Sequence, residues 1–224
     1  MSEIVQDYIE DYIRGLIPLG SPEIEEFRIR AENEEVPIIH KEVQKHIEML
    51  IHANKIQSVL EVGTAVGYSS SIFALAMGPH GHVDTIERSL KMIVQADENI
   101  SALGLKKQIN ILIGDAQEKV EELTKTYDMI FLDGAKGHYI HLLDHCLRCL
   151  KPGGMLVSDN VLFKGMIASD DLVVRRKITI VKRMRKYLEV ISNHPQLITS
   201  VLPLGDGLAV SWKKDELDLN GENP

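Results

Sequence analysis

Residues 58–70 read SVLEVGTAVGYSS, and this stretch decides the fold. Its first five residues, 58–62, are mostly apolar, which is typical of a buried strand. Gly63 and Gly67 follow, and glycines let the backbone turn sharply and approach a ligand closely. The next residues open a helical stretch, whose free N–H groups and dipole favour a carboxylate or a phosphate. The stretch therefore predicts a strand, a ligand-binding loop and a helix of an open sheet.

Short apolar runs and helical stretches alternate through the rest of the chain. Runs typical of buried strands occupy residues 58–62, 82–87, 109–114, 127–133 and 154–159. Helices are predicted over residues 69–77, 90–103, 116–124, 139–150 and 170–191. Residues 197–213 indicate two strands joined by a turn at Gly205, Asp206 and Gly207. The sequence predicts an α/β fold, a Rossmann-like, doubly wound, mostly parallel seven-stranded sheet with an antiparallel C-terminal edge hairpin.

Three further helices are predicted before the first strand. Tyr8 and Tyr12 recur at helical spacing, and Pro18 ends their segment. Ser21 and Pro22 have the pattern of a helix start. Residues 1–56 are predicted to form an N-terminal helical cap, and residues 57–214 the sheet, within one and the same domain. Residues 215–224 are predicted to form a polar tail.

Composition excludes several classes of protein. Hydrophobic residues make up 44% of the chain and charged residues 26%, a balance that excludes disordered and collagen-like chains. No apolar run approaches the roughly 20 residues that a membrane span needs. The only cysteines are Cys146 and Cys149, and the N-terminus is acidic where a signal peptide is basic, so we expect a cytoplasmic protein. The formal net charge of −8 means that any polyanion would need a local basic patch.

Acidic residues follow the glycine loop at a spacing that fits a nucleoside. Glu87 ends the second predicted strand, 20 residues after Gly67, where a carboxylate can bind both hydroxyls of a ribose. Asp115 and Ala116 close the third strand, where they can meet an adenine amino group. A tight turn without a ligand is the alternative for this set. The missing third glycine of the dinucleotide fingerprint disfavours an NAD-dependent oxidoreductase.

This ordered set resembles that of the class I S-adenosylmethionine-dependent methyltransferases. The resemblance implies that the glycine loop holds the methionyl end of the cofactor, Glu87 the ribose, and Asp115 the adenine. An early segment over residues 36–39 lines the cofactor in the family, with Ile38 as the contact here. The implied cofactor-binding residues are Ile38, Glu61, Gly63, Ser69, Ser70, Glu87, Asp115, Ala116 and Asp133.

Oxygen-bearing side chains follow the fourth and fifth predicted strands. Asp133 follows one strand, and Asp159 and Asn160 follow the next, so all three can converge at one edge of the sheet. Two carboxylates and an amide suit Mg²⁺, Mn²⁺ or Ca²⁺ and disfavour zinc. The alternative is that each aspartate caps the helix after it. Lys136 lies beside this set, where it could accept a proton from a hydroxyl or stabilise an oxyanion.

The pattern D-x-x-K-x-x-Y followed by D-N is similar to that of the metal-dependent O-methyltransferases of the catechol and caffeoyl-CoA type. The resemblance covers residues 36–213. It implies that Asp133, Asp159 and Asn160 bind Mg²⁺ or Mn²⁺ and that Lys136 and Asp133 are catalytic. It also implies that S-adenosylmethionine is the methyl donor and that the protein is a homodimer.

A basic stretch follows the predicted metal ligands. Residues 175–186 carry seven Lys and Arg residues, which indicate either a solvated helix face or an RNA-binding surface. The overall resemblance is closest to a bacterial branch that methylates 5-hydroxyuridine at the tRNA wobble position, giving 5-methoxyuridine. The alternatives are an O-methyltransferase of small catechol-like phenols and a catalytically silent cofactor-binding protein that docks on RNA. The predicted RNA-binding residues are Lys164, Arg175, Arg176 and Lys177.

Other polar residues receive no catalytic role from the sequence. The run HLLDHCLRCL over residues 141–150 indicates buried thiols on a crossover helix rather than a zinc site. His138 and Tyr139 could contact substrate or pack within the loop. Asp206 is predicted to be a turn residue, and His40 receives no assignment.

Overall fold

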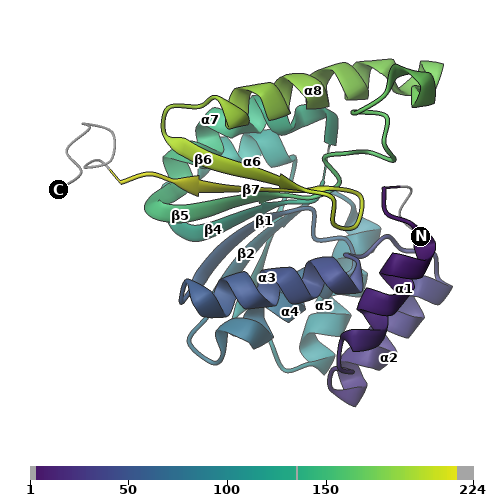
Figure 1. The fold of residues 1–224 in the computed structure, drawn as a ribbon. Coiled ribbons are helices and arrows are strands. Elements are labelled where there is room, and N and C mark those ends of the chain that lie inside the picture. The colour runs from purple at the N-terminus through teal and green to yellow at the C-terminus, as the bar shows by residue number, and fades with distance from the viewer. Residues whose placement is uncertain (1–3, 135, 216–224) are drawn as a thin grey trace.

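One seven-stranded sheet forms the centre of the molecule (Figure 1). The computed structural model describes residues 4–134 and 136–215. The sheet order is β3-β2-β1-β4-β5-β7-β6, with β1 to β5 parallel and β7 antiparallel to both of its neighbours. This confirms the predicted fold class and the edge hairpin. The strands are β1 Ser58–Val62, β2 His82–Glu87, β3 Ile109–Ile113, β4 Tyr127–Leu132, β5 Leu150–Ser158, β6 Leu197–Leu202 and β7 Leu208–Lys213.

Helices cover both faces of the sheet (Figure 1). On one face lie α3, α4 and α5, and on the other lie α6, α7 and α8. Neighbouring strand residues alternate between the two cores: Val59 belongs to the first and Leu60 to the second. The bounds of these helices are α3 Lys41–Ala53, α4 Tyr68–Met77, α5 Leu90–Ala102, α6 Ala116–Glu122, α7 Tyr139–Cys149 and α8 Ile178–Ser192.

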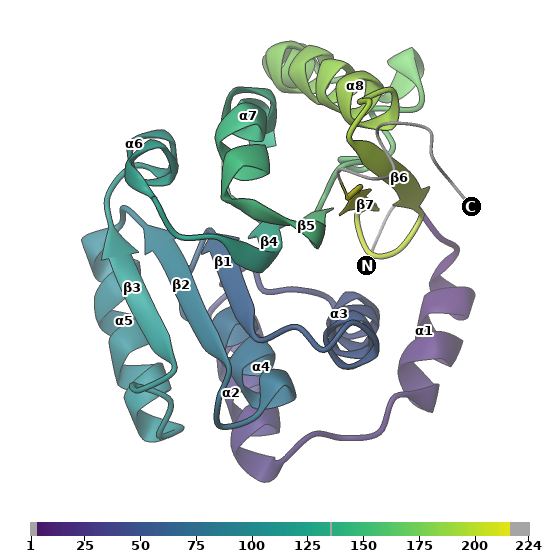
Figure 2. The ribbon, with the colours of Figure 1, turned by 90° about the vertical axis from the view of Figure 1, so that its left-hand side faces the viewer.

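The N-terminal helices are α1 Asp7–Leu16 and α2 Pro22–Asn33, and α1 lies at the edge of the molecule (Figure 2). The polar side of α1 faces inward, because the Arg14 guanidinium lies 2.8 Å from the Glu42 carboxylate of α3. Its aromatic side faces outward, with Tyr8 71% and Tyr12 68% exposed. An exposed apolar side on a helix is typical of an interaction surface. The homodimer stays a prediction.

The predicted helix over residues 170–191 is wrong at its start. The α8 helix begins at Ile178, and two 3₁₀ turns, η2 Asp170–Leu172 and η3 Arg175–Lys177, precede it. Val173 and Val174 between the turns are extended, as β-branched residues prefer. Arg185 holds the part of the loop that leads into these turns, because it donates to the carbonyl oxygens of residues 166 and 167 and pairs with Asp170 of η2. The periodicity is therefore helical only from Ile178 onward.

The strand predicted over 154–159 begins earlier, at Leu150, because Leu150 pairs with Tyr127 across an irregular register. The predicted tail over 215–224 lies outside the described residues, apart from Asp215. Within the described part of the chain, no helix is long and apolar enough to span a membrane.

Candidate active site

The glycine loop contacts the turn that follows β4. Gly63 has φ +107° and Gly67 has φ +82°, backbone conformations that favour glycine. A Cβ at Gly63 would lie 3.0 Å from the Gly134 nitrogen and 3.1 Å from the Asp133 carbonyl carbon. Only glycine permits this approach. The loop that resembles a cofactor site and the turn that carries Asp133 therefore touch.

Beneath the loop, Glu61 is fully buried and only partly satisfied. Thr85 Oγ1 donates to Glu61 Oε2 at 2.5 Å, while Glu61 Oε1 and Ser70 Oγ are buried and, among the described residues, have no partner in good hydrogen-bond geometry. Burial raises the pKa of Glu61 to about 7, against the lowering effect of nearby hydroxyls. Orphaned buried polar atoms are costly in a native protein. These two atoms fit the polar methionyl end of the predicted cofactor, which would supply partners.

The predicted ribose and adenine residues share one cavity with the loop. Glu87 Oε2 accepts a hydrogen bond from Ala65 N at 3.0 Å, so the carboxylate also holds the glycine loop. Asp115 Oδ1 accepts from Gln117 N and caps α6. A cavity of about 130 Å³ is lined by Gly63, Glu87, Asp115 and Ala116, among others. The structure brings these residues together, and their binding roles stay predictions.

Glu87 gives a direct test of the cofactor site. A Glu87→Ala variant is expected to bind S-adenosylmethionine more weakly by about 1–3 kcal/mol, because it loses charged hydrogen bonds to the ribose and the contact that holds Ala65. Isothermal titration calorimetry measures the change. Glu98→Ala, which removes a carboxylate from the exposed side of α5, is the control. Unchanged affinity in Glu87→Ala would show that the ribose assignment is misplaced.

Asp133 and Asp159 follow neighbouring strands that end in register. Leu132 of β4 pairs with Ser158 of β5, and Asp159 N donates to the Leu132 carbonyl oxygen at 2.9 Å. Burial raises the pKa of both carboxyls, and repulsion from Asp133 raises that of Asp159 further, while Lys136 lowers both. A buried carboxylate, Asp159, and a half-buried one, Asp133, fit a hard divalent cation, which would neutralise them.

Asn160 completes the predicted ligand set. The Asn160 backbone has φ +57°, and the backbone N–H of Asn160 donates to Asp159 Oδ1 at 2.7 Å. Among residues 4–134 and 136–215, no group of three or more His, Cys, Asp and Glu side chains is placed to hold a metal. The predicted set has two carboxylates and an amide, so the absence of three such side chains does not test it, and it stays a prediction.

Cys146 and Cys149 are buried free thiols on α7, in agreement with the packing interpretation.

Tyr139 packs in the core rather than facing a substrate. Its hydroxyl donates to the carbonyl oxygens of Leu132 at 2.9 Å and Asp159 at 3.2 Å, and its ring packs edge-on against Tyr187. The tyrosine of the D-x-x-K-x-x-Y pattern therefore holds together the two strand ends that carry the predicted metal ligands.

Asp206 and His40, to which the sequence assigns no catalytic role, lie beside the predicted metal ligands. Asp206 Oδ1 accepts from Lys164 N at 2.5 Å, so the β6–β7 turn holds the loop after Asn160. Burial raises the pKa of Asp206, and the hydrogen bond from Lys164 N and the nearby charge of Lys136 lower it. His40 lies near Asp159, and its Nδ1 lies 2.9 Å from Arg14 Nη2. No local pattern signals these contacts, because they depend on how β7 pairs with β5.

Arg28 was also missed by the sequence analysis. It is 3% exposed, and its guanidinium donates to the Ile39 carbonyl oxygen at 3.1 Å and to Tyr68 Oη at 3.0 Å. It thus joins the segment that carries Ile38 to the first residue of α4, directly after the glycine loop. A buried arginine on a charged helix such as α2 leaves no sequence signal.

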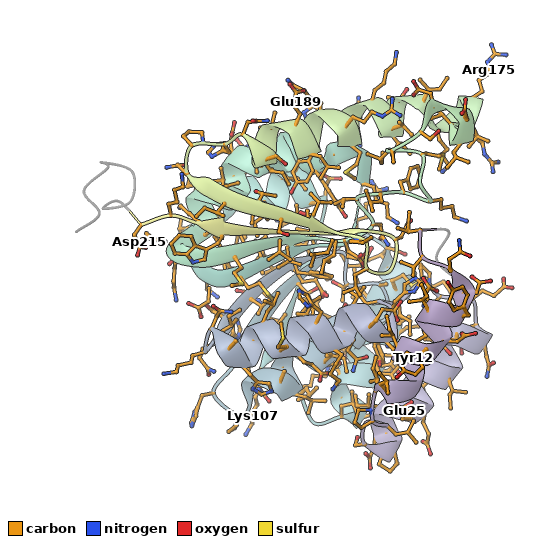
Figure 3. The ribbon with its side chains drawn as sticks, in the orientation of Figure 1. Tyr12, Glu25, Lys107, Arg175, Glu189 and Asp215 are labelled. Carbon is orange, nitrogen blue, oxygen red and sulfur yellow. The ribbon has the colours of Figure 1, made fainter. Side chains whose placement is uncertain are left out.

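The predicted RNA-binding residues separate in space. Lys177 lines a cavity of about 560 Å³ that also contains Asp115, Ala116 and Lys136. Arg175 and Arg176 are exposed and do not line it; Figure 3 shows Arg175 at the outer corner of the molecule. Lys164 is exposed on the loop that Asp206 holds. Of the four, Lys177 lines the cavity that the candidate catalytic lysine also lines.

The family model for O-methyltransferases matches residues 22–214. The chain belongs to this family. A catechol O-methyltransferase of Niastella koreensis is 33% identical over 131 residues, which cover 57% of this chain and 59% of the relative. A catechol O-methyltransferase of Mycobacterium tuberculosis is 28% identical over 189 residues, covering 79% of this chain and 82% of the relative.

Solved structures agree with this membership. A Staphylococcus aureus structure, provisionally named a caffeoyl-CoA O-methyltransferase, has a TM-score of 0.86 and 36% identity, and covers 92% of this chain and 100% of that one. An O-methyltransferase from Bacillus cereus in complex with SAH has a TM-score of 0.81 at 22% identity, covers 92% of this chain and 97% of that one, and supports the fold. The chain is an S-adenosylmethionine-dependent O-methyltransferase of the catechol and caffeoyl-CoA type.

Proposed function

We propose that this chain is a divalent-metal-dependent O-methyltransferase whose acceptor is the 5-hydroxyl of 5-hydroxyuridine at the tRNA wobble position. Two observations carry the metal-dependent part: the backbone of Asp133 lies against the glycine loop, and both Asp133 and Lys136 act electrostatically on the buried Asp159 carboxyl. The cation would be held by Asp133, Asp159 and Asn160. When bound, it would lower the pKa of the acceptor hydroxyl, and the sulfonium cofactor would supply the methyl group.

The roles of the side chains follow from their positions. Lys136 is the lysine that acts on both carboxylates of the predicted site, where its neutral amine would accept the proton of the acceptor hydroxyl or its ammonium would stabilise the resulting oxyanion. Glu87 and the glycine loop fix the cofactor, so that the methyl group and the acceptor oxygen are aligned. Most of the acceleration then comes from holding the two partners in line.

The substrate part of the proposal is supported by the charge of the 560 Å³ cavity. Lys136 and Lys177 line this cavity, and Arg175 and Arg176 of η3 are adjacent to Lys177 in sequence. These positive charges stand in a chain whose net charge is −8. The 5-hydroxyl and the 4-carbonyl of 5-hydroxyuridine also form a vicinal oxygen pair, which can chelate a hard cation. Wobble bases lie in a loop, where a protein can splay them out.

A second candidate acceptor is a small catechol-like phenol, which has the same vicinal oxygen pair. The names of the relatives favour it over an RNA, because they include catechol and caffeoyl-CoA O-methyltransferases. Both candidates use the same metal and lysine. A free catechol carries no phosphate, whereas a wobble nucleotide does, so these two acceptors differ in whether phosphates can contribute to recognition.

A panel of acceptors separates the two candidates. We expect the purified enzyme with S-adenosylmethionine and Mg²⁺ to convert 5-hydroxyuridine in tRNA to 5-methoxyuridine, as measured by nucleoside mass spectrometry, and tRNA from a deletion strain to lack 5-methoxyuridine. Arg175→Gln/Arg176→Gln/Lys177→Gln is expected to weaken tRNA binding and to flatten its salt dependence. Methylation of catechol and caffeoyl-CoA without methylation of hydroxylated tRNA would replace the first candidate by the second.

A further inference from the structure

The loop after Asn160 places an aromatic ring among cations. The Phe163 ring centroid lies 5.9 Å from Lys136 Nζ and 5.6 Å from Lys177 Nζ. Arg183 Nη1 donates to the Gly137 carbonyl oxygen at 3.3 Å, which places its guanidinium on the wall of the same 560 Å³ cavity. Phe163 is partly exposed in that wall. A solvated ring beside cations is the arrangement with which proteins stack nucleobases and other aromatic ligands.

The backbone that presents Phe163 is strained and firmly held. Phe163 has φ +44° and Lys164 has φ +57°, a left-handed conformation that residues other than glycine rarely adopt. The turn at Asp206 fixes it, since the Asp206 carboxylate accepts from Lys164 N and the Asp206 carbonyl oxygen accepts from Leu162 N. Strain of this kind persists only where the surroundings impose it, and it clusters at ligand sites.

The cations at the α8 end of this cavity are uncompensated. Arg88, at the cofactor end, pairs with Asp115 at 3.6 Å. Within the described parts of the chain, neither Lys177 nor Arg183 forms an ion pair with a carboxylate, whereas their neighbours Arg185 and Lys186 do. In a chain of net charge −8, two unpaired cations at a cavity wall indicate an anionic ligand.

We propose that Lys177 and Arg183 form a phosphate-binding subsite for the methyl acceptor, and that Phe163 stacks on an aromatic ring joined to that phosphate. This rests on the proposed function, because it takes the cavity as the approach of the acceptor to Lys136. The ligand class is an aromatic acceptor that carries a phosphate ester. A nucleotide within an RNA and a phenol joined to coenzyme A both belong to this class.

Binding without turnover tests the subsite. Calorimetry compares uridine 5′-monophosphate with uridine on protein saturated with S-adenosylhomocysteine. We expect the monophosphate to bind about ten-fold more tightly than the nucleoside, and Lys177→Gln/Arg183→Gln to abolish this difference. Phe163→Leu is expected to weaken both ligands. The matched control is Lys182→Gln/Lys186→Gln, which removes two exposed charges of α8 that do not line the cavity.

The outcomes distinguish this subsite from the proposed function. Equal binding of uridine and its monophosphate by the wild-type protein would overturn the subsite, as would an equal loss in the control variant. Tighter binding of coenzyme A than of the monophosphate, lost in Lys177→Gln/Arg183→Gln, would support the subsite and assign it to a thioester acceptor. If the monophosphate preference holds but no acceptor is methylated with Mg²⁺, the subsite stands and the proposed function fails.

Discussion

Asp133→Ala and Asp159→Ala are each expected to lower kcat/KM by about a thousand-fold, because activation of the acceptor by a divalent cation contributes several kcal/mol. Excess chelator is expected to abolish the activity of the wild-type enzyme, and added Mg²⁺ to restore it. Initial rates with S-adenosylmethionine and the accepted substrate measure both effects. The size of the loss follows from the predicted ligand set, because each variant removes one of its two carboxylates.

Asp144→Ala is the matched control, because Asp144 is an exposed carboxylate on α7 and lies outside the site. Thermal unfolding without metal is expected to show that Asp159→Ala folds at least as stably as the wild type, since it loses a buried carboxylate that is repelled by Asp133. Full turnover by Asp133→Ala/Asp159→Ala, or in excess chelator, would contradict the metal-dependent mechanism.

Replacement of Lys136 is expected to have the second largest effect. Lys136→Met should lower kcat by about 10²–10⁴-fold with little change in the KM for S-adenosylmethionine, because it removes a general base and not a cofactor contact. Lys136→Arg should be nearly as inactive, since a guanidinium stays protonated and cannot accept the proton. Single-turnover rates at saturating cofactor measure the chemical step.

The two Lys136 variants separate the possible roles of the lysine. Recovery of Lys136→Arg to within a few-fold of wild type would show that Lys136 acts by its positive charge, as an oxyanion stabiliser. Lys125→Met is a control that removes an exposed lysine from the opposite end of the sheet, where it pairs with Asp84. Its kcat should match that of the wild type.

The fold could be predicted because its signals are local. Alternating apolar runs define the strands, and Gly63 and Gly67 mark a turn that their positive φ angles require. The position of Glu87, Asp133 and Asp159 at one edge of the sheet could be predicted from topology. Glu87 is the last residue of a parallel strand, and each aspartate directly follows one, and the carboxyl ends of parallel strands meet at the same edge.

The parts that the sequence did not predict depend on tertiary contacts. Asp206 reaches the loop after Asn160 only because β7 pairs antiparallel with β5. Arg28 joins segments that are 11 and 40 residues away along the chain. The helix start at Ile178 was mispredicted because the loop from residue 166 is held by Arg185, which lies on the helix itself.

A crystal structure of the protein with Mg²⁺ and S-adenosylhomocysteine tests the central claim most directly. We predict one octahedral ion at about 2.1 Å from side-chain oxygens of Asp133, Asp159 and Asn160, with the cofactor sulfur facing it across the acceptor site. An ion bound elsewhere, or a cofactor bound away from the glycine loop, would contradict the account.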